Sequence, residues 1–346
     1  MKPVLRSVAE ILPDTRVAVR LDLDLPIGDN QIMDNSRLVK SLPTLKLLLE
    51  KNCHLLILGH RDRPEGVDIT YSLKPVYLEL LSLFEDDNQA PGSIFIDDVN
   101  SQDPIDLALA NNRIVFLENL RFWPGETGND PKFLSFLPQI CQAYVNDALA
   151  VAHRSHASIM LHRKLPAFYG LGFIDEIDKL DSIIASASHP VTLILAGAKA
   201  DKLSYLPRLA NFADYILIGG KLPQLLSEEI RTLISRDVNH FLVAKLTAYT
   251  FDISPDSIDK FIQIISQSKT IIWVGSLGFY EDSRYRAGSQ AVARAVAATA
   301  AKKIIAGGDT VAALKDLGLV NQVDVVSSGG GMLLEYLIKG SLAAWS

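Results

Sequence analysis

The sequence contains little cysteine. Cys53 and Cys141 stand far apart in a chain of 346 residues and have no metal-binding spacing. Such a pair excludes the disulfide framework of a small secreted protein. It is typical of small buried side chains in a reduced protein.

Long apolar segments are also absent. The first residues, MKPVLRSVAEILPD, lack a continuous apolar core of signal-peptide length. No run of about 18 uncharged apolar residues occurs, and the alanine-rich stretch AVARAVAATAA is interrupted by Arg294. We therefore expect a cytoplasmic protein that does not associate with membranes.

Charge of one sign is not concentrated in any segment. The net charge is -6, and neither a basic run nor an acidic tail occurs. This distribution gives no support to nucleic-acid binding. The phosphate-binding pattern G-x-x-x-x-G-K-[ST] is missing too, so a P-loop is excluded.

The chain does contain short apolar runs that alternate with segments of helical periodicity. In the first half these runs are RVAVRLDL (16–23), HLLILGH (54–60), SIFID (93–97), RIVFLEN (113–119) and AYVND (143–147). In the second half they are VTLILAG (191–197), YILIGG (215–220), TIIWVG (270–275), KIIAGG (303–308) and VDVVSSGGG (323–331). Continuous apolar runs of this length, separated by helices, predict parallel sheets buried on both faces.

The two halves differ in the residues at the ends of their strands. Charged residues come after the strands of the first half, and glycines come after those of the second. Ligands of open α/β sheets bind beyond the carboxyl ends of the strands. We therefore expect a basic pocket for a small anion in the first half, and a glycine-lined surface for phosphates and a flat ring in the second.

The basic pocket is predicted from cationic residues at strand ends and at one helix start. They are Arg37, His60, Arg63, Arg121, His153, Arg154 and His156. Arginine binds phosphate and carboxylate groups through two parallel hydrogen bonds. Any one of these residues taken alone is more typical of a solvated surface charge. Asp22 and Asp24 either orient the arginines or form an ordinary turn before Pro26.

Two motifs in the second half predict phosphate contacts. In LILAGAKADKL, Lys199 and Lys202 follow a glycine turn and share a face if the segment is helical. In IAGGDTVAAL, Asp309 and Thr310 begin a helix. Asp309 either caps that helix or binds Mg²⁺, which prefers one or two carboxylates together with phosphate oxygens.

Several segments together resemble the phosphoglycerate kinase family. They are RLDLDLP, MDNSRLVKSLPTL, GHRDRPEG, LENLRFWPGETGND, YVNDALAVAHRSHAS, FDISPDSIDKF, SKTIIWVG, IAGGDTVAAL and SSGGG. The resemblance implies an α/β fold with two Rossmann-like three-layer α/β/α domains joined by a hinge helix. It assigns 1–170 with 332–346 to a 3-phosphoglycerate-binding domain, 171–190 to the hinge and 191–331 to a nucleotide-binding domain.

The same resemblance implies a monomeric kinase of glycolysis that bends at a hinge. It would transfer a phosphoryl group reversibly between 1,3-bisphosphoglycerate and ADP, giving 3-phosphoglycerate and ATP, with Mg²⁺ as cofactor. The implied acid-binding residues are Asp22, Asp24, Arg37, His60, Arg63, Arg121 and Arg154. The implied nucleotide-binding residues are Gly197, Ala198, Lys199, Lys202, Gly220, Lys221, Gly275, Glu281, Gly308, Asp309 and Thr310. Asp309 would be the metal ligand, and Arg37, Lys199, Gly307 and Gly308 would act on the phosphoryl group.

The sequence departs from the family pattern at a few positions. Asp24 replaces the usual asparagine, and we expect Arg61 to offset its charge. Lys221 replaces a glycine, and the stretch between Lys221 and Phe251 lacks several dozen residues that normally line the adenine pocket. These departures leave two alternatives open: a related kinase for another acyl phosphate, or an inactive homologue that still binds nucleotide.

Overall fold

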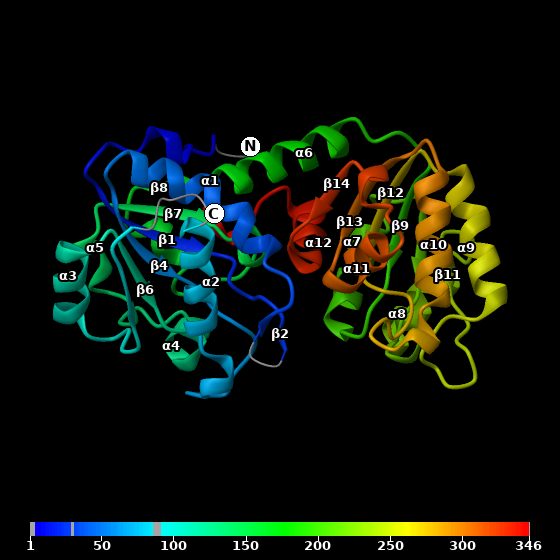
Figure 1. Ribbon diagram of the computed structural model, residues 1–346. Helices are drawn as coiled ribbons and strands as arrows, with labels where there is room; N and C mark the ends of the chain where they lie inside the picture. The colour runs from blue at the N-terminus through cyan, green and yellow to red at the C-terminus, as the bar shows by residue number, and fades with distance from the viewer. Residues whose placement is uncertain (1–3, 29–30, 86–90, 346) are drawn as a thin grey trace. The chain divides into compact units, whose positions relative to one another are not determined.

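The computed structural model describes residues 4–28, 31–85 and 91–345, which fold into two compact units (Figure 1). One unit contains the chain up to Asp175 and the residues from Ser341 onward, and the other runs from Glu176 to Gly340. The division falls inside helix α6 (Leu171–Ala185), within the segment predicted as the hinge. Helix α12 (Gly330–Lys339) belongs to the second unit, so only the last residues of the predicted return segment belong to the first.

The first unit is built on a parallel sheet of six strands in the order β5-β6-β4-β1-β7-β8. These strands are β1 (Arg16–Leu21), β4 (His54–Leu58), β5 (Ser93–Ile96), β6 (Ile114–Leu117), β7 (Ala143–Asp147) and β8 (Ala167–Tyr169). Five of them lie within the predicted runs. The three-residue edge strand β8 was not predicted, and neither was the small antiparallel pair of β2 (Ile27–Gly28) and β3 (Gln31–Ile32).

Alternate residues of these strands face two separate cores. On one face, Val17 and Val19 pack with Leu45 of helix α1 (Ser36–Glu50) and Leu80 of α2 (Lys74–Glu85). On the other face, Ala18 and its neighbours pack against α3 (Gln102–Asn111) and α5 (Leu137–Ile140). The short helix α4 (Pro124–Thr127) lies between β6 and β7 in the chain. The unit therefore has three layers, as its doubly apolar strands predict.

The second unit repeats this design with the strand order β11-β10-β9-β12-β13-β14. Its strands are β9 (Val191–Leu195), β10 (Tyr215–Ile218), β11 (Phe241–Val243), β12 (Thr270–Val274), β13 (Lys302–Ala306) and β14 (Val325–Ser327). Only the edge strand β11 lies outside the predicted runs. The order of connection reverses between β9 and β12, which is where open α/β sheets bind their ligands.

Helices cover both faces of this second sheet. Trp273 of β12, fully buried, packs in a core with Phe261 of α9 (Pro255–Gln267) and Val292 of α10 (Ala287–Ala298). Helix α11 (Gly308–Asp316) adds Leu314 to that core, while α12 contacts α7 (Leu206–Leu209). Full burial of a side chain such as Phe261, Val292 or Leu314 stabilises a fold by about 1.5–3 kcal/mol relative to leaving it exposed.

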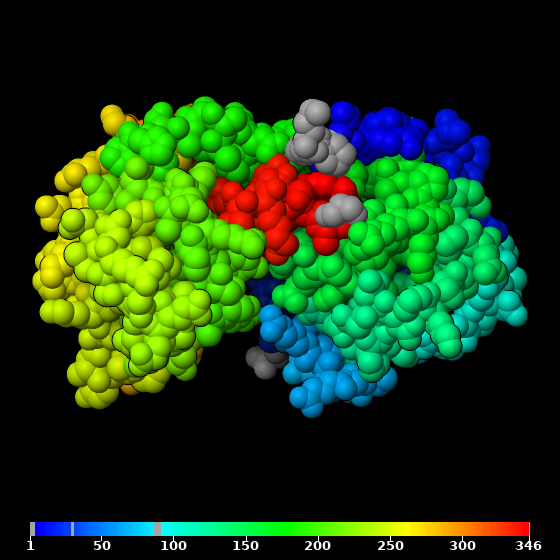
Figure 2. Space-filling view, turned by 180° about the vertical axis from the view of Figure 1, so that it is seen from behind, coloured from blue at the N-terminus to red at the C-terminus, as the bar shows by residue number. Residues whose placement is uncertain are grey.

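The stretch that comes after β10 lies at the surface of the second unit. Figure 2 shows this region in yellow-green on the face opposite to that of Figure 1. Its helix α8 (Glu228–Arg236) buries only Ile230. The region in which residues are expected to be missing is therefore peripheral to the sheet.

The two cysteines and the apolar content of the helices bear on two expectations from the sequence. Cys53 and Cys141 are both free and buried, and burial raises the pKa of the Cys141 thiol to about 12. No helix in the described part of the chain combines the length and the apolar composition needed to cross a membrane.

Candidate active-site residues

A buried arginine that was not among the predicted site residues lies at the centre of the basic pocket. Arg20, in β1, is fully buried, and its Nη2 lies 2.5 Å from Nδ1 of His60. Because a guanidinium has no acceptor, Nδ1 must accept this hydrogen bond. The neutral ring then carries its proton on Nε2, so His60 can donate one further hydrogen bond.

Both buried histidines of the pocket are kept neutral. Burial, and next the positive charges of Arg20 and Arg121, hold the pKa of His60 well below its usual value. The same causes lower the pKa of His156 to about 3. These two rings therefore add no positive charge to the pocket at neutral pH, unlike its arginines.

Arg37 pairs with Asp22 at the end of β1. Their Nη1 and Oδ1 atoms lie 3.0 Å apart. Burial raises the pKa of Asp22, whereas Arg37 opposes this rise. Among the described residues, Oδ2 of Asp22 has no hydrogen-bond partner. This carboxylate therefore orients Arg37 and retains one free oxygen for a ligand hydroxyl.

Arg121 lies among like charges. Burial, followed by Arg154 and Arg20, lowers its pKa to about 10. Its guanidinium donates to the carbonyl of Asp62, but Nε has no partner within the described part of the chain. Cations brought so close repel one another, and a bound anion would relieve that repulsion. Arg63 adds a weaker repulsion from its exposed position.

The predicted partner of Asp24 is wrong. The guanidinium of Arg61 donates to the carbonyl of Thr70 at 2.6 Å and lies over the ring of Tyr71. Asp24 instead accepts a hydrogen bond from the backbone N–H of Asp62 at 2.8 Å. Arg61 contacts nearby residues instead of Asp24, because the following segment of the chain offers it a carbonyl oxygen and an aromatic ring.

In the second unit, glycines bring the ends of β9, β10 and β12 together. A Cβ atom at Gly275 would lie 2.2 Å from the carbonyl oxygen of Ala196. One at Gly220 would lie 2.5 Å from the nitrogen of Gly197. Larger residues are excluded at both positions. The next residue, Lys221, is exposed and donates its N–H to Gly197 O at 2.9 Å.

Lys202 is directed into these glycine turns. Its Nζ donates to the carbonyl of Ala196 at 2.7 Å. Desolvation, with a smaller contribution from the nearby charge of Lys199, lowers the pKa of Lys202 to about 8 against the opposing effect of Asp201. Lys199 and Ala198 are exposed beside it. The structure thus brings both predicted lysines to the end of β9, with Lys202 the more enclosed.

The start of α11 combines a buried hydroxyl with an acid. Thr310 is fully buried, yet its Oγ1 has no hydrogen-bond partner among the described residues. Desolvation, and next the carboxylate of Glu281, raises the pKa of Asp309. A Cβ at Gly308 would meet nothing within 4 Å, so the approach to the helix N-terminus is open.

These residues also fit a metal ion that arrives with phosphate. The described residues contain no group of three or more potential metal ligands. Asp309 with Glu281 nearby nevertheless suits Mg²⁺, which takes few protein carboxylates when phosphate oxygens complete its shell.

The two sets of residues, one rich in arginines and one lined by glycines and lysines, suit phosphorylated small molecules on an α/β fold. The chain belongs to the phosphoglycerate kinase family, whose model matches residues 9–236 and 227–340. A relative named phosphoglycerate kinase, from Rubrobacter xylanophilus, is 31% identical over 376 residues and covers 96% of this chain and 95% of its own. This confirms the resemblance predicted from the sequence, and the enzyme class is that of phosphotransferases.

Solved structures agree with this assignment. Phosphoglycerate kinase from Coxiella burnetii matches with a TM-score of 0.74 and 27% identity, over 98% of this chain and 97% of its own. The enzyme from Pyrococcus horikoshii OT3 matches with a TM-score of 0.83 over 99% and 97%. Its identity of 21% supports the fold alone, which is the predicted two-domain α/β fold.

The comparisons also bear on chain length. The 376 aligned residues exceed the 346 of this chain, so the Rubrobacter relative has residues that this chain lacks. The two matched segments of the family model meet at 227–236, inside the stretch predicted to be shortened.

Proposed function

We propose that the chain catalyses Mg²⁺-dependent, reversible phosphoryl transfer between 1,3-bisphosphoglycerate and ADP, giving 3-phosphoglycerate and ATP in glycolysis. The observation that supports it most is the family match, which extends over nearly the whole chain. The reaction needs bound anions held in place and neutralised, and the chain offers arginines in one unit and lysines in the other.

We propose that the acid substrate binds in the first unit. The residues proposed to hold it are Asp22, Asp24, Arg37, His60, Arg63, Arg121 and Arg154. The free Nε of Arg121 and the Nε2–H expected on His60 are donors suited to phosphate or carboxylate oxygens. The free oxygen of Asp22 suits the substrate hydroxyl.

We propose that the nucleotide binds in the second unit. The residues proposed for it are Gly197, Ala198, Lys199, Lys202, Gly220, Lys221, Gly275, Glu281, Gly308, Asp309 and Thr310. The unpartnered hydroxyl of Thr310 and the open helix N-terminus favour phosphate oxygens there. Asp309 would hold Mg²⁺, which neutralises charge on the phosphates when bound.

Base recognition is proposed to be relaxed. Phe251, half exposed, contacts Phe279 and Tyr285, with ring centroids 6.1 and 4.9 Å apart. Phe279 precedes Glu281 by two residues, so these rings offer apolar contact near the proposed ribose acid. Aromatic faces stack on any base, so we expect comparable turnover with ATP and GTP. Strict preference for ATP would contradict this.

Catalysis is proposed to rest on positioning and charge neutralisation rather than on a protein nucleophile. Arg37, Lys199 and the backbone donors of Gly307 and Gly308 would stabilise the phosphoryl group in transfer. Since the two ligands bind to different units, transfer requires them to approach, and we propose bending at α6 for this step. We further propose a cytoplasmic monomer, which sedimentation of the purified protein would test.

A coupled assay of phosphoryl transfer from MgATP to 3-phosphoglycerate tests the proposal. We expect turnover that Lys199→Ala and Arg37→Ala abolish. Lys269→Ala, which removes an exposed lysine outside the proposed site, should retain it. Absence of turnover with 3-phosphoglycerate still bound would refute the assigned reaction. Absence of binding as well would favour an inactive homologue.

A further inference from the structure

The first unit contains a pocket that the proposed reaction does not use. Its volume is about 610 Å³, within the range of roughly 300–1,000 Å³ typical of small-molecule sites. It lies at the carboxyl ends of β5 and β6, at one edge of the sheet, and none of its lining residues belongs to the proposed acid site.

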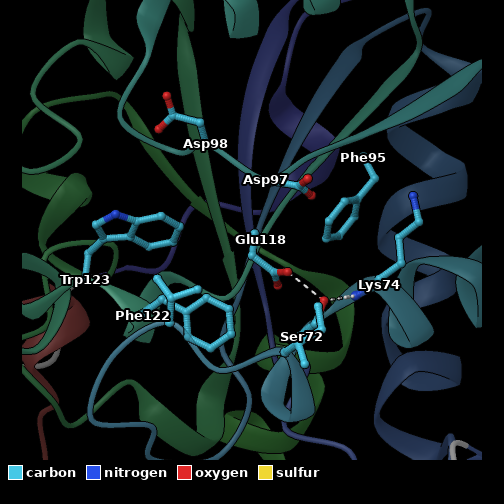
Figure 3. Close-up of a pocket in the computed structure, with 10 residues that line it drawn as sticks. Ser72, Lys74, Phe95, Asp97, Asp98, Glu118, Phe122 and Trp123 are labelled. Carbon is cyan, nitrogen blue, oxygen red and sulfur yellow. Dashed lines mark hydrogen bonds between the residues drawn. The ribbon is translucent and has the colours of Figure 1, made fainter.

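Aromatic side chains form its walls. Figure 3 shows Phe95 on one side of the pocket, and Trp123 and Phe122 on the other, with Glu118 between them. Phe122 is buried and Trp123 half-buried, so both rings are held in place. Walls of this kind accept a flat ring by stacking or edge contact.

Glu118 places a buried negative charge in the pocket. The residue as a whole is 6% exposed. It accepts hydrogen bonds from Ser72 Oγ at 2.6 Å and from the N–H groups of Leu73 and Asn119 at 2.7 and 2.6 Å. No cation among the described residues pairs with it. A buried carboxylate held by neutral donors alone favours a cationic ligand.

The remaining charged residues leave this negative balance in place. Asp97 is exposed at the rim and has no hydrogen-bond or ion-pair partner in the described part of the chain. The ammonium group of Lys74 is engaged with two rings, 4.7 Å from the centroid of Phe95 and 5.1 Å from that of Tyr77. Asp98, in contrast, already accepts bonds from Ser101 and from Asn100 N.

We propose that this pocket binds a small organic ammonium ion that carries a flat ring. The ring lies between the aromatic walls, and the ammonium group faces Asp97 and Glu118. Cations are also attracted to the faces of aromatic rings, so charge and shape select the same ligand. An anion is disfavoured by the carboxylates, and a neutral ring gains only the apolar contacts.

Three matched probes test the proposal by fluorine NMR on the full chain. They are para-trifluoromethylbenzylammonium, the corresponding benzyl alcohol and the corresponding benzoate. We expect the cation to bind about two- to fivefold more tightly than the alcohol, as for an exposed ion pair, and the benzoate most weakly. Equal affinities for the three probes would overturn the proposal. Displacement of the cation by 3-phosphoglycerate would place it in the acid site and would also overturn it.

Variants locate the binding. Asp97→Asn should reduce the preference for the cation, since only Glu118 then faces the ammonium group, while leaving affinity for the alcohol and phosphoryl transfer unchanged. Trp123→Leu should weaken both probes by removing a wall. Asp259→Asn, an exposed acid on α9 in the other unit, makes the same change in net charge and should alter neither. Insensitivity of the cation to both Asp97→Asn and Trp123→Leu would refute the assignment.

Discussion

The hydroxyl of Ser158 donates a hydrogen bond to Oε1 of Glu126 at 2.6 Å, and both side chains are fully buried. The same hydroxyl accepts a bond from Nε of Arg20 at 2.9 Å. Since Arg20 in turn donates to His60, a single buried chain of hydrogen bonds fixes the ring of His60 from behind. Glu126 thereby balances the charge of Arg20 without contacting it directly.

Ser158→Ala breaks this chain and leaves Nε of Arg20 unpaired. We expect the free energy of unfolding to fall by about 1–3 kcal/mol, the cost of an unsatisfied buried donor. Urea unfolding followed by circular dichroism measures it. Ser135→Ala, at an exposed position of the same unit, should change it by less than about 0.5 kcal/mol. Equal effects of the two substitutions would show that this buried chain of hydrogen bonds does not stabilise the fold.

Stability should decline as the pH falls below about 6.5, in part through His156. Its folded pKa of about 3 lies below the usual 6.5, so only the unfolded chain gains a proton within that interval. His156→Gln should reduce the slope between pH 7 and pH 5 by up to about 1.4 kcal/mol per pH unit. Urea unfolding at several pH values tests this. Asp147, whose pKa burial raises to about 6, acts with the opposite sign in both proteins and cancels in the comparison.

Nucleotide binding should take up a proton through Lys202. With a pKa of about 8, much of Lys202 is neutral at pH 8.5, and a nearby phosphate raises that pKa. Calorimetric titration of MgADP in buffers of different ionisation enthalpy measures the uptake. Lys202→Met should remove it, whereas Lys199→Arg should keep it. Uptake that persists in Lys202→Met would assign the proton to another group.

Asp24→Asn should tighten binding of 3-phosphoglycerate. Asp24 interacts electrostatically with Arg37 and Arg121 and so opposes a trianionic ligand. An asparagine retains the acceptor for the N–H of Asp62 but loses the charge. We expect a dissociation constant about fivefold lower, as for about 1 kcal/mol of repulsion. Isothermal titration tests this against Asp130→Asn, an exposed acid elsewhere in the unit; no difference would contradict it.

The sequence predicts the inner strands well because each is an apolar run longer than a turn. Strands β8 and β11 have three residues each and lie at sheet edges, so their short apolar segments did not stand out. The edge strand β14 is equally short, but the glycine-rich end of the run VDVVSSGGG marked it. The segments of β8 and β11 form strands because they hydrogen-bond to the neighbouring strands β7 and β10. The fold class required only the alternation of runs and helical segments.

The candidate sites are predictable as far as residues lie just after strands. Arg20 was not predicted as a site residue because it lies inside a strand. A charged residue within the apolar run RVAVRL nevertheless indicates a buried polar contact. Ser158 and Glu126 carry no such signal, since their bond joins residues 32 positions apart. The partner of Arg61 was wrong because a loop's own carbonyls are not visible in sequence. The roles of the predicted site residues stay predictions.

The position of β11 has a consequence for how such a chain can be trimmed. Among the residues that the structure describes, this strand pairs only with β10, and the surface helix α8 precedes it. A deletion between β10 and β11 therefore affects only this edge of the sheet. The pairing registers of β9, β12 and β13 stay the same. The chain can therefore become shorter at the edge of the sheet while the residues at the ends of the inner strands keep their positions. A shorter chain and an intact candidate site are compatible in this fold.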